Sequence, residues 1–197
     1  EEGLYNWRTP DGKHLFKNTW FSDTTDFHNG LAIVETREGG KNETQEVGKN
    51  VVTTSGKRLF GDDFSKEVKK IEIKNINDND YILLYMNDSN PVYVYQSFDD
   101  FKELYRETGL PSSSTITENG YIVIYIKKDG KTYANVVSPD GRLVLNYPNN
   151  VEKWIPLKYE EYSNGYFIFK GGGGEYLYLS FNSGKLYDKN GKKVGES

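Results

Sequence analysis

Residues 119–142 read NGYIVIYIKKDGKTYANVVSPDGR, and this stretch decides the fold class. Two runs rich in β-branched and aromatic residues, 121–126 and 133–137, are each bounded by turns that contain glycine. Asp-Gly and Asn-Gly between apolar runs are hairpin signals, because glycine adopts a positive φ at little steric cost. The stretch therefore predicts a strand, a tight turn, a second strand and another turn.

Both kinds of turn recur along the chain. Asn followed by Gly or Asp stands before an apolar run at Asn29, Asn79, Asn119 and Asn164. A turn whose glycine is followed by Lys or Arg has that glycine at Gly12, Gly56, Gly141 and Gly184, spaced by roughly 43 residues or twice that. We predict an all-β protein of about four tandem β-meander repeats. The expected units are approximately 1–29 (partial), 30–78, 79–118, 119–163 and 164–197, in a single domain covering 1–197.

The first strand of the later units is apolar at consecutive positions, so both of its faces need cover. Stacked repeats supply such cover, because each sheet then lies between its neighbours. A blade of four short strands takes about 40–50 residues. The expected arrangement is therefore propeller-like or a layered β array.

One helix is expected where the third glycine turn is missing. Ser97 is a suitable N-cap, and Asp100 follows in the positively polarised first turn. Apolar residues then recur at helical spacing, and Gly109 ends the pattern. We predict one short helix near residues 98–108, which packs over a sheet or docks a partner.

The pattern resembles a known family of bacterial repeat proteins. Residues 27–34, FHNGLAIV, are similar to the aromatic-x-x-Gly-Leu-Ala-x-Val stretch of the WG (KWG) repeat family. Residues 48–57, GKNVVTTSGK, resemble that family's strand leading into a Gly-Lys turn. No Trp of this chain is followed by Gly, so the resemblance is to a divergent member. It implies a β-repeat scaffold that mediates interactions and brings no catalytic residues.

Composition narrows the classes of function. The 197 residues include no Cys and two His, which removes disulfides and thiolate chemistry and leaves no metal-like ligand spacing. A net charge of −4 argues against nucleic acid as a partner. No apolar run is long enough for a transmembrane segment. No cofactor is expected, and a first residue other than Met slightly favours an exported protein with a processed N-terminal segment.

Three pairs of adjacent acids are the candidates for catalysis: Asp62-Asp63, Asp99-Asp100 and Glu160-Glu161. Glycoside hydrolysis needs two carboxyl groups facing each other across a cleft. Adjacent residues on a strand point to opposite faces, so a single pair makes no such site. Asp99-Asp100 fits a helix start, and the other pairs fit solvated turns. A carboxylate-dependent glycoside hydrolase is the lesser alternative.

Aromatic side chains are the remaining candidates for a binding surface. Tyr93, Tyr95, Tyr176 and Tyr178 alternate with Val or Leu and should line one face of their strands. Together with Trp154 they form the candidate surface for a partner or ligand, unless stacked repeats cover them. The expected function is a non-catalytic module for protein–protein interaction. The alternative is a carbohydrate-binding surface protein that uses rows of Tyr and Trp.

Overall fold

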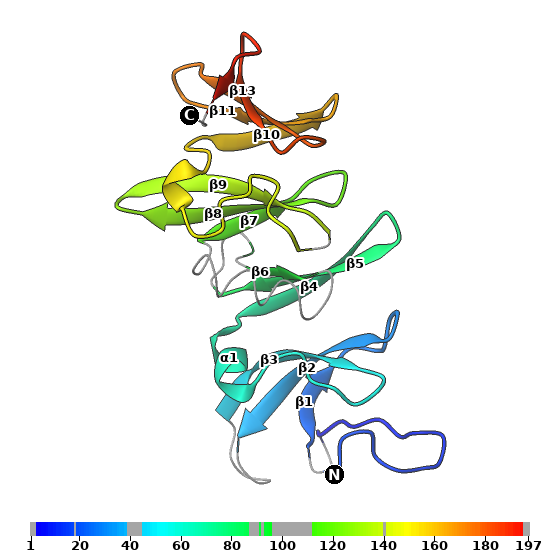
Figure 1. The fold of residues 1–197 in the computed structure, drawn as a ribbon. Helices are drawn as coiled ribbons and strands as arrows, with labels where there is room; N and C mark the ends of the chain where they lie inside the picture. Colours follow the sequence, from blue (N-terminus) through cyan, green and yellow to red (C-terminus); the bar gives the residue numbers. More distant parts are fainter. Residues whose placement is uncertain are drawn as a thin grey trace. The chain divides into compact units, whose positions relative to one another are not determined.

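The computed structural model describes residues 3–17, 19–38, 45–86, 91, 93–95, 112–139 and 141–194. It is mostly β, with four antiparallel sheets and a short α-helix in the described part of the chain (Figure 1). The expected all-β class is therefore confirmed. The helix expected near 98–108 lies outside the described residues. Among the residues described, no helix has the length and apolar character to cross a membrane.

In each sheet the strands lie in the order in which the chain forms them. The first sheet contains β1 (Phe21–Thr24), β2 (Leu31–Glu38) and β3 (Gln45–Thr53), and α1 (Asp62–Glu67) follows. The second contains β4 (Lys70–Ile76), β5 (Asn79–Tyr85) and β6 (Tyr93–Tyr95). The third contains β7 (Ser113–Ile116), β8 (Ile122–Lys128) and β9 (Lys131–Val137). After a 3-10 turn at Val151–Lys153, the fourth contains β10 (Lys158–Ser163), β11 (Tyr166–Lys170), β12 (Tyr176–Ser180), β13 (Leu186–Asp188) and β14 (Lys193–Val194).

Backbone contacts divide the chain into two compact units. Unit 1 is Glu1–Glu72 with Leu84–Ser89, and unit 2 is Ile73–Leu83 with Asn90–Ser197. A core cluster of unit 1 is formed by Phe16, Phe21, Ala32, Val34 and Val52, with Trp7 packed against it. In unit 2 the third and fourth sheets share a core that includes Val123, Ala134 and Val136 from one sheet and Phe167, Phe169 and Leu179 from the other.

Two of the four leading turns differ from expectation. Asn29-Gly30 and Asn164-Gly165 are two-residue turns with positive φ at both positions, as expected. The second such turn is instead Asn77-Asp78 (φ 51° and 60°), and Asn79 is already the first residue of β5. Gly120 lies in a longer turn, in which the Thr117 N–H donates to Tyr121 O. Each sheet therefore starts one strand before the expected unit boundary, because the strand preceding the turn pairs with the strand that follows it.

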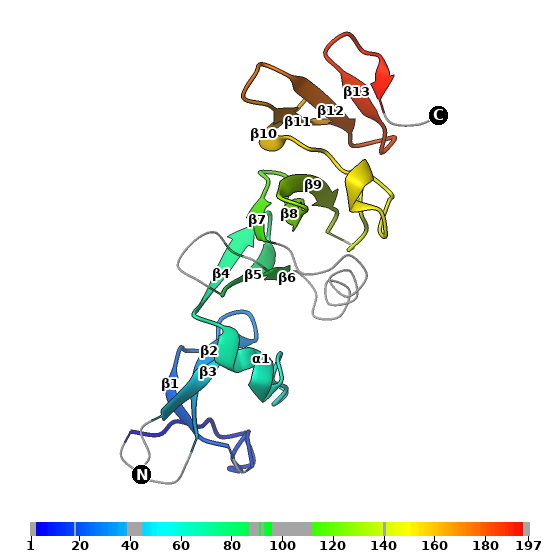
Figure 2. The same ribbon diagram turned by 90° about the vertical axis from the view of Figure 1, so that its left-hand side faces the viewer.

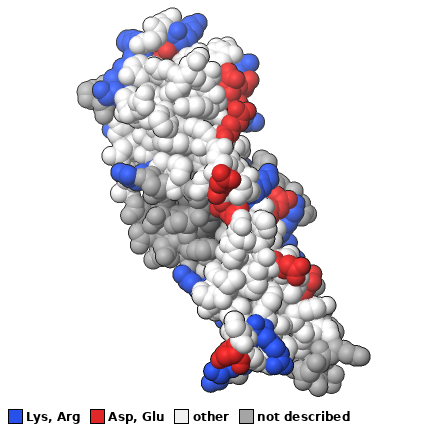
Figure 3. Space-filling view, turned by 90° about the vertical axis from the view of Figure 1, so that its right-hand side faces the viewer, with Lys and Arg blue, Asp and Glu red and all other residues white. Residues whose placement is uncertain are grey.

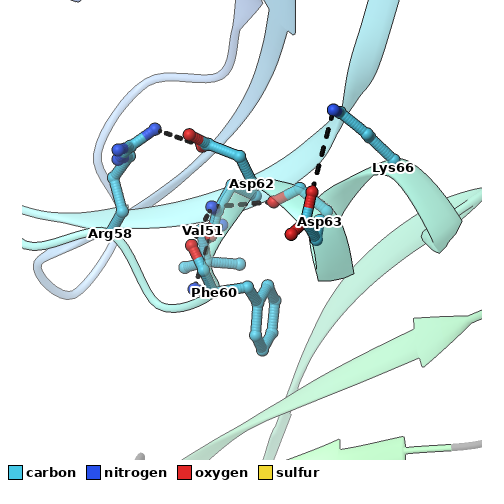
Figure 4. A network of polar contacts seen from close by, with 8 residues as sticks. Val51, Arg58, Phe60, Asp62, Asp63 and Lys66 are labelled. Carbon is cyan, nitrogen blue, oxygen red and sulfur yellow. Dashed lines mark hydrogen bonds and ion pairs between the residues drawn. The ribbon is translucent and has the colours of Figure 1, made fainter.

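Three asparagines make the same backbone contact at a distance of ten residues. Asn50 Nδ2 donates to Phe60 O (2.7 Å) and Asn50 Oδ1 accepts from Phe60 N (3.0 Å). Asn135 pairs in this way with Leu145 (2.8 and 3.2 Å), and Asn6 pairs with Phe16 (2.7 and 3.3 Å). We call each arrangement an asparagine bracket. Figure 4 shows Phe60, the partner of Asn50 in its bracket, next to Val51. The brackets at Asn50 and Asn135 are fully buried.

The helix α1 was not expected from the sequence. Asp62 and Asp63 form its first turn rather than a solvated loop, and carboxylates are favourable there because the unpaired N–H groups carry positive partial charge. Asp62 pairs with Arg58 at 2.7 Å, and Asp63 lies 3.8 Å from Lys66 (Figure 4). Ser65, on the buried side of the helix, accepts a hydrogen bond from Asn50 Nδ2 (2.9 Å). The asparagine bracket at Asn50 thus ties α1 to β3.

Three interacting side chains on the second sheet make the stability of unit 1 depend on pH in the alkaline range. Tyr85 Oη donates to Glu72 Oε2 at 2.8 Å, and Lys70 pairs with the same carboxylate. Burial, and then the contact with Glu72, raises the pKa of Tyr85 to about 12 from its ordinary value of 10.0. A raised folded-state pKa means that the unfolded chain loses its proton first. The stability from this group is therefore fully present below pH 10 and lost as the pH rises through 12.

We expect a Tyr85→Phe variant to lose less stability than the wild type between about pH 9 and pH 11, because the variant has no phenol to ionise at this site. Urea unfolding at each pH, followed by tryptophan fluorescence, measures the difference. Glu72→Gln, which keeps the shape of the acceptor but removes its charge, should give an intermediate slope. Identical slopes for all three proteins would contradict the assignment.

Candidate functional site

The outer face of the fourth sheet is the candidate site. Residues on β11 alternate between exposed or half-buried and buried, so that Tyr166 and Ile168 point away from the core that Phe167 and Phe169 fill. By contrast, the middle of β8 is buried at consecutive positions. Strand β11 thus has apolar residues on both faces, although only one face is covered within the described residues. Tyr166, at 38% exposure, is among the most exposed large hydrophobic residues described.

The antiparallel register brings further tyrosines onto this face. Ile168 lies opposite Tyr178, which in turn lies opposite Tyr187 on β13. Tyr176 is two residues from Tyr178 on the same strand and therefore shares its face. We call this set the tyrosine face: Tyr166, Ile168, Tyr176, Tyr178 and Tyr187.

The rings of the tyrosine face contact one another in two ways. Tyr176 and Tyr178 are nearly parallel, with centroids 6.4 Å apart and an interplanar angle of 23°. Tyr166 meets Tyr178 at 6.3 Å and 88°, and Tyr187 at 6.4 Å and 85°. These edge-to-face contacts are favourable because a ring's positive edge meets a negative face. They hold Tyr166 upright between its neighbours, so the rings do not form one flat platform.

Two lysines stand at the margin of this face. Lys170 Nζ lies 5.6 Å from the centre of the Tyr176 ring, within the range of a cation–π contact. Interaction with Tyr176, and then the charge of Glu160, raises the pKa of the Lys170 ammonium. Lys193 on β14 lies opposite Tyr187. Glu161 on β10 lies opposite Ile168, so the apolar centre has charged side chains of both signs at its edge.

The structure separates the aromatic residues proposed from the sequence. Tyr176 and Tyr178 lie on the tyrosine face. Tyr93 is buried at 5% exposure, because both faces of its strand are covered; Val94 is buried as well. The side chain of Tyr95 lies outside the described part. Trp154 is 2% exposed and its Nε1 donates to Tyr147 O (2.8 Å), so it is a core residue rather than a surface residue.

Tyr166, Ile168 and Tyr187 were missed by the sequence argument. Tyr166 and Ile168 were assigned to a strand covered on both faces, as β8 is. Tyr187 follows a turn and belongs to a strand of three residues, which is too short to show an alternation. The pairing of Tyr178 with Tyr187 depends on the register of β12 and β13, which the sequence signals only through the turn at Gly184.

The described residues contain no group of three His, Asp or Glu side chains arranged to hold a metal ion. Asp62 and Asp63 are accounted for by α1 and its ion pairs. His14 packs edge-on against Trp20, with ring centroids 4.9 Å apart. Gly171–Gly174 form the loop of the β11–β12 hairpin, where the Gly171 N–H donates to Glu175 O.

Charge on the surface is mixed in sign. In the view of Figure 3, acidic and basic side chains of the described residues both occur, with broad uncharged areas between them. No protein-family model, curated protein or solved structure matches the chain.

Proposed function

We propose that this chain is a non-catalytic β-repeat module that binds a protein partner through the tyrosine face. The observation that carries the proposal is an apolar strand face, formed by the exposed Tyr166 and the half-buried Ile168, that no sheet covers within the described residues, although the middle of β8 is buried on both faces. Large uncovered apolar patches mark interaction surfaces. Tyrosine is enriched at such surfaces because it offers a large rigid ring and a polar tip.

The proposed repeat is supported by contacts that recur in both units. The three brackets belong to Asn6, Asn50 and Asn135, each six residues before the glycine of a Gly-Lys or Gly-Arg turn. A second recurring contact concerns the turn glycines. A Cβ on Gly56 would lie 3.2 Å from Leu15 O, and one on Gly184 would lie 2.6 Å from Val144 O. Leu15 and Val144 each stand three residues after the preceding turn glycine.

These recurring contacts favour a layered array of tandem units, each with its turn packed on the one before. These contacts are compatible with a divergent member of the WG repeat family, because this chain and that family both have a strand that leads into a Gly-Lys turn.

The geometry of the rings favours a protein over a glycan. Sugar rings stack on aromatic faces, and a row of parallel exposed rings suits an extended glycan. Tyr166 stands at 88° and 85° to two of its neighbours, so ring edges and hydroxyls are presented together with Ile168. Such a mixed surface, with Lys170, Lys193 and Glu161 at its margin, suits a protein that presents apolar side chains with charged residues of both signs around them.

Replacing the centre of the tyrosine face should abolish partner capture. We expect the double variant Tyr178→Thr with Tyr187→Thr to bind the partner at least about tenfold more weakly, because central tyrosines are frequent hot spots. Threonine is chosen because it retains a high β propensity. Immobilised wild type and variant would be exposed to an extract of the cells that make the protein, and retained proteins quantified by mass spectrometry. A retained protein would then be titrated directly.

Tyr5→Thr is the matched control, since Tyr5 is 50% exposed and lies in unit 1. The control should retain the partner, and melting curves should show that all variants are folded. An unchanged set of retained proteins for the double variant would contradict the proposal. Binding of the wild type to a glycan array, lost in the double variant, would favour carbohydrate instead. Self-association lost in the double variant would identify the partner as a second copy.

A further inference from the structure

A second surface of unit 2 carries a different chemistry. Between the third sheet and the start of the fourth sheet, the structure has a cleft of about 620 Å³. The wall on the third sheet includes Ser113, Tyr125, Lys127 and Thr132. Ser113 lies opposite Tyr125, and Lys127 opposite Thr132, so the four side chains share one face of that sheet. The other wall is the segment Pro156, Leu157, Lys158 and Tyr159.

The cleft is rich in hydrogen-bond donors that have no acceptor. Tyr125 Oη accepts a hydrogen bond from the Tyr159 N–H (3.1 Å), which leaves its own proton to donate. Within the described residues nothing accepts that proton, nor the hydroxyl protons of Ser113 and Thr132. Burial, and then the charge of Glu118, raises the pKa of Tyr159 to about 12. Tyr125 and Ser113 are half-buried, and a half-buried donor without an acceptor is costly unless a ligand or water supplies one, whereas Thr132 is exposed.

The charged side chains that line the cleft are all cations. Lys127, Lys131 and Lys158 contribute ammonium groups, and no carboxylate is part of the lining. None of the three lysines forms an ion pair with another residue in the described part of the chain. By contrast, the neighbouring Lys128 is neutralised by Glu152 at 2.9 Å. No ion pair within the described residues offsets these three ammonium groups, although the charges of Glu118 and Glu161 act on the neighbouring Tyr159.

The rest of the lining is apolar. The rings of Tyr125 and Tyr159 and the side chains of Leu157 and Pro156 offer a surface on which a planar or aliphatic body can pack. Sites for small molecules typically have volumes of about 300–1,000 Å³ and combine such a surface with a few polar groups that fix orientation. The cleft meets this description, with donors and cations supplying the polar part.

We infer that this cleft binds a small organic anion, in which a carboxylate, sulfate or phosphate group is attached to an apolar or ring-shaped body. The anionic group is held by the ammonium groups of Lys127, Lys131 and Lys158 and by the Tyr125 O–H. The body packs between the Tyr125 and Tyr159 rings and Leu157. This site is separate from the tyrosine face and does not depend on the function proposed for that face.

Binding of defined probes tests the inference. Benzoate, phenyl sulfate and phenyl phosphate would be titrated into the whole chain and followed by amide chemical shifts and calorimetry. Benzyl alcohol serves as the neutral probe, and inorganic phosphate as the anion without a body. At least one aryl anion should bind saturably, with shifts at β8, β9 and residues 156–159, and at least about tenfold more tightly than the alcohol or inorganic phosphate. The preferred aryl anion identifies the anionic group.

Two sets of substitutions separate a built site from general attraction to positive charge. The triple variant Lys127→Gln, Lys131→Gln and Lys158→Gln should weaken the best probe at least about tenfold. Lys185→Gln, Lys189→Gln and Lys192→Gln remove the same charge from the exposed C-terminal hairpins and should leave affinity within about twofold, since only screened long-range attraction changes. Tyr125→Phe should weaken binding several-fold by removing one donor. Absence of saturable binding by every aryl anion, equal losses in both triple variants, or equal affinity for benzyl alcohol would each overturn the inference.

Discussion

Replacing Gly48 by alanine is expected to lower the free energy of unfolding of unit 1 by about 3–5 kcal/mol. Gly48 has a φ of 125°, which side chains with a Cβ rarely adopt. A Cβ at this position would lie 2.0 Å from Ser65 O and 2.3 Å from Ser65 C. These atoms are backbone of α1 and cannot rotate away, so the helix or strand β3 would have to move. The asparagine bracket at Asn50, which also reaches Ser65, would be disturbed with it.

Denaturation by urea, followed by the fluorescence of Trp7 in the unit 1 core, measures this change. Gly130→Ala is the matched control, because Gly130 has a φ of 76° but no atom within 4 Å of the added Cβ. That variant should cost only about 1–2 kcal/mol, the steric cost of the positive φ. If Gly48→Ala cost no more than Gly130→Ala, the close approach of α1 to β3 would be refuted.

The second large effect is expected at the buried bracket of unit 2. Asn135→Leu should destabilise the protein by about 2–3 kcal/mol, because the buried N–H of Leu145 would lose its partner and its C=O would keep only the bond from the Tyr147 N–H. The Val136 N–H would lose its contact with Asn135 Oδ1 as well. Leucine is similar in size to asparagine, so the loss would report hydrogen bonding rather than a cavity. Thermal and urea unfolding measure it.

The same substitution at the other two brackets allows the losses in stability to be compared within one protein. Asn50→Leu should cost at least as much as Asn135→Leu, since both amides are fully buried and Asn50 also donates to Ser65. Asn6 is only half-buried, so water can replace its bonds and Asn6→Leu should cost about 1 kcal/mol. Three equal losses, or a negligible loss at Asn135, would show that the brackets do not stabilise the protein as proposed.

The sequence predicted the β class well because hairpin turns are determined locally. Gly30, Gly130 and Gly165 have the positive φ that two-residue turns require, and each lies where a turn was expected. Asn77-Asp78 was missed because two polar residues other than glycine adopt positive φ there, and the visible Asn79 stands just beyond it. Helix α1 was missed because it has only six residues and its N-cap, Gly61, offers no side-chain hydrogen bond.

The candidate site was predicted only in part, because exposure depends on which element packs against a strand. The alternation around Tyr176 and Tyr178 correctly placed both tyrosines on one face. The same alternation occurs at Tyr93, but the structure buries the ring of Tyr93. The pairing of Tyr178 with Tyr187 cannot be read from the alternation of residues within one strand. The cleft beside Tyr125 is lined by residues that lie far apart in the sequence. Tertiary packing decides both, and sequence periodicity does not report it.

The order of the strands has a consequence for how quickly the protein folds. Within each sheet every strand pairs with the strand that immediately precedes or follows it in the chain. The contacts that define a sheet therefore close short loops, and the chain entropy lost before the first favourable contact is small. Proteins with such local contacts fold faster than β-sandwiches that join distant strands. A nascent chain could accordingly form each sheet as its last strand emerges during synthesis.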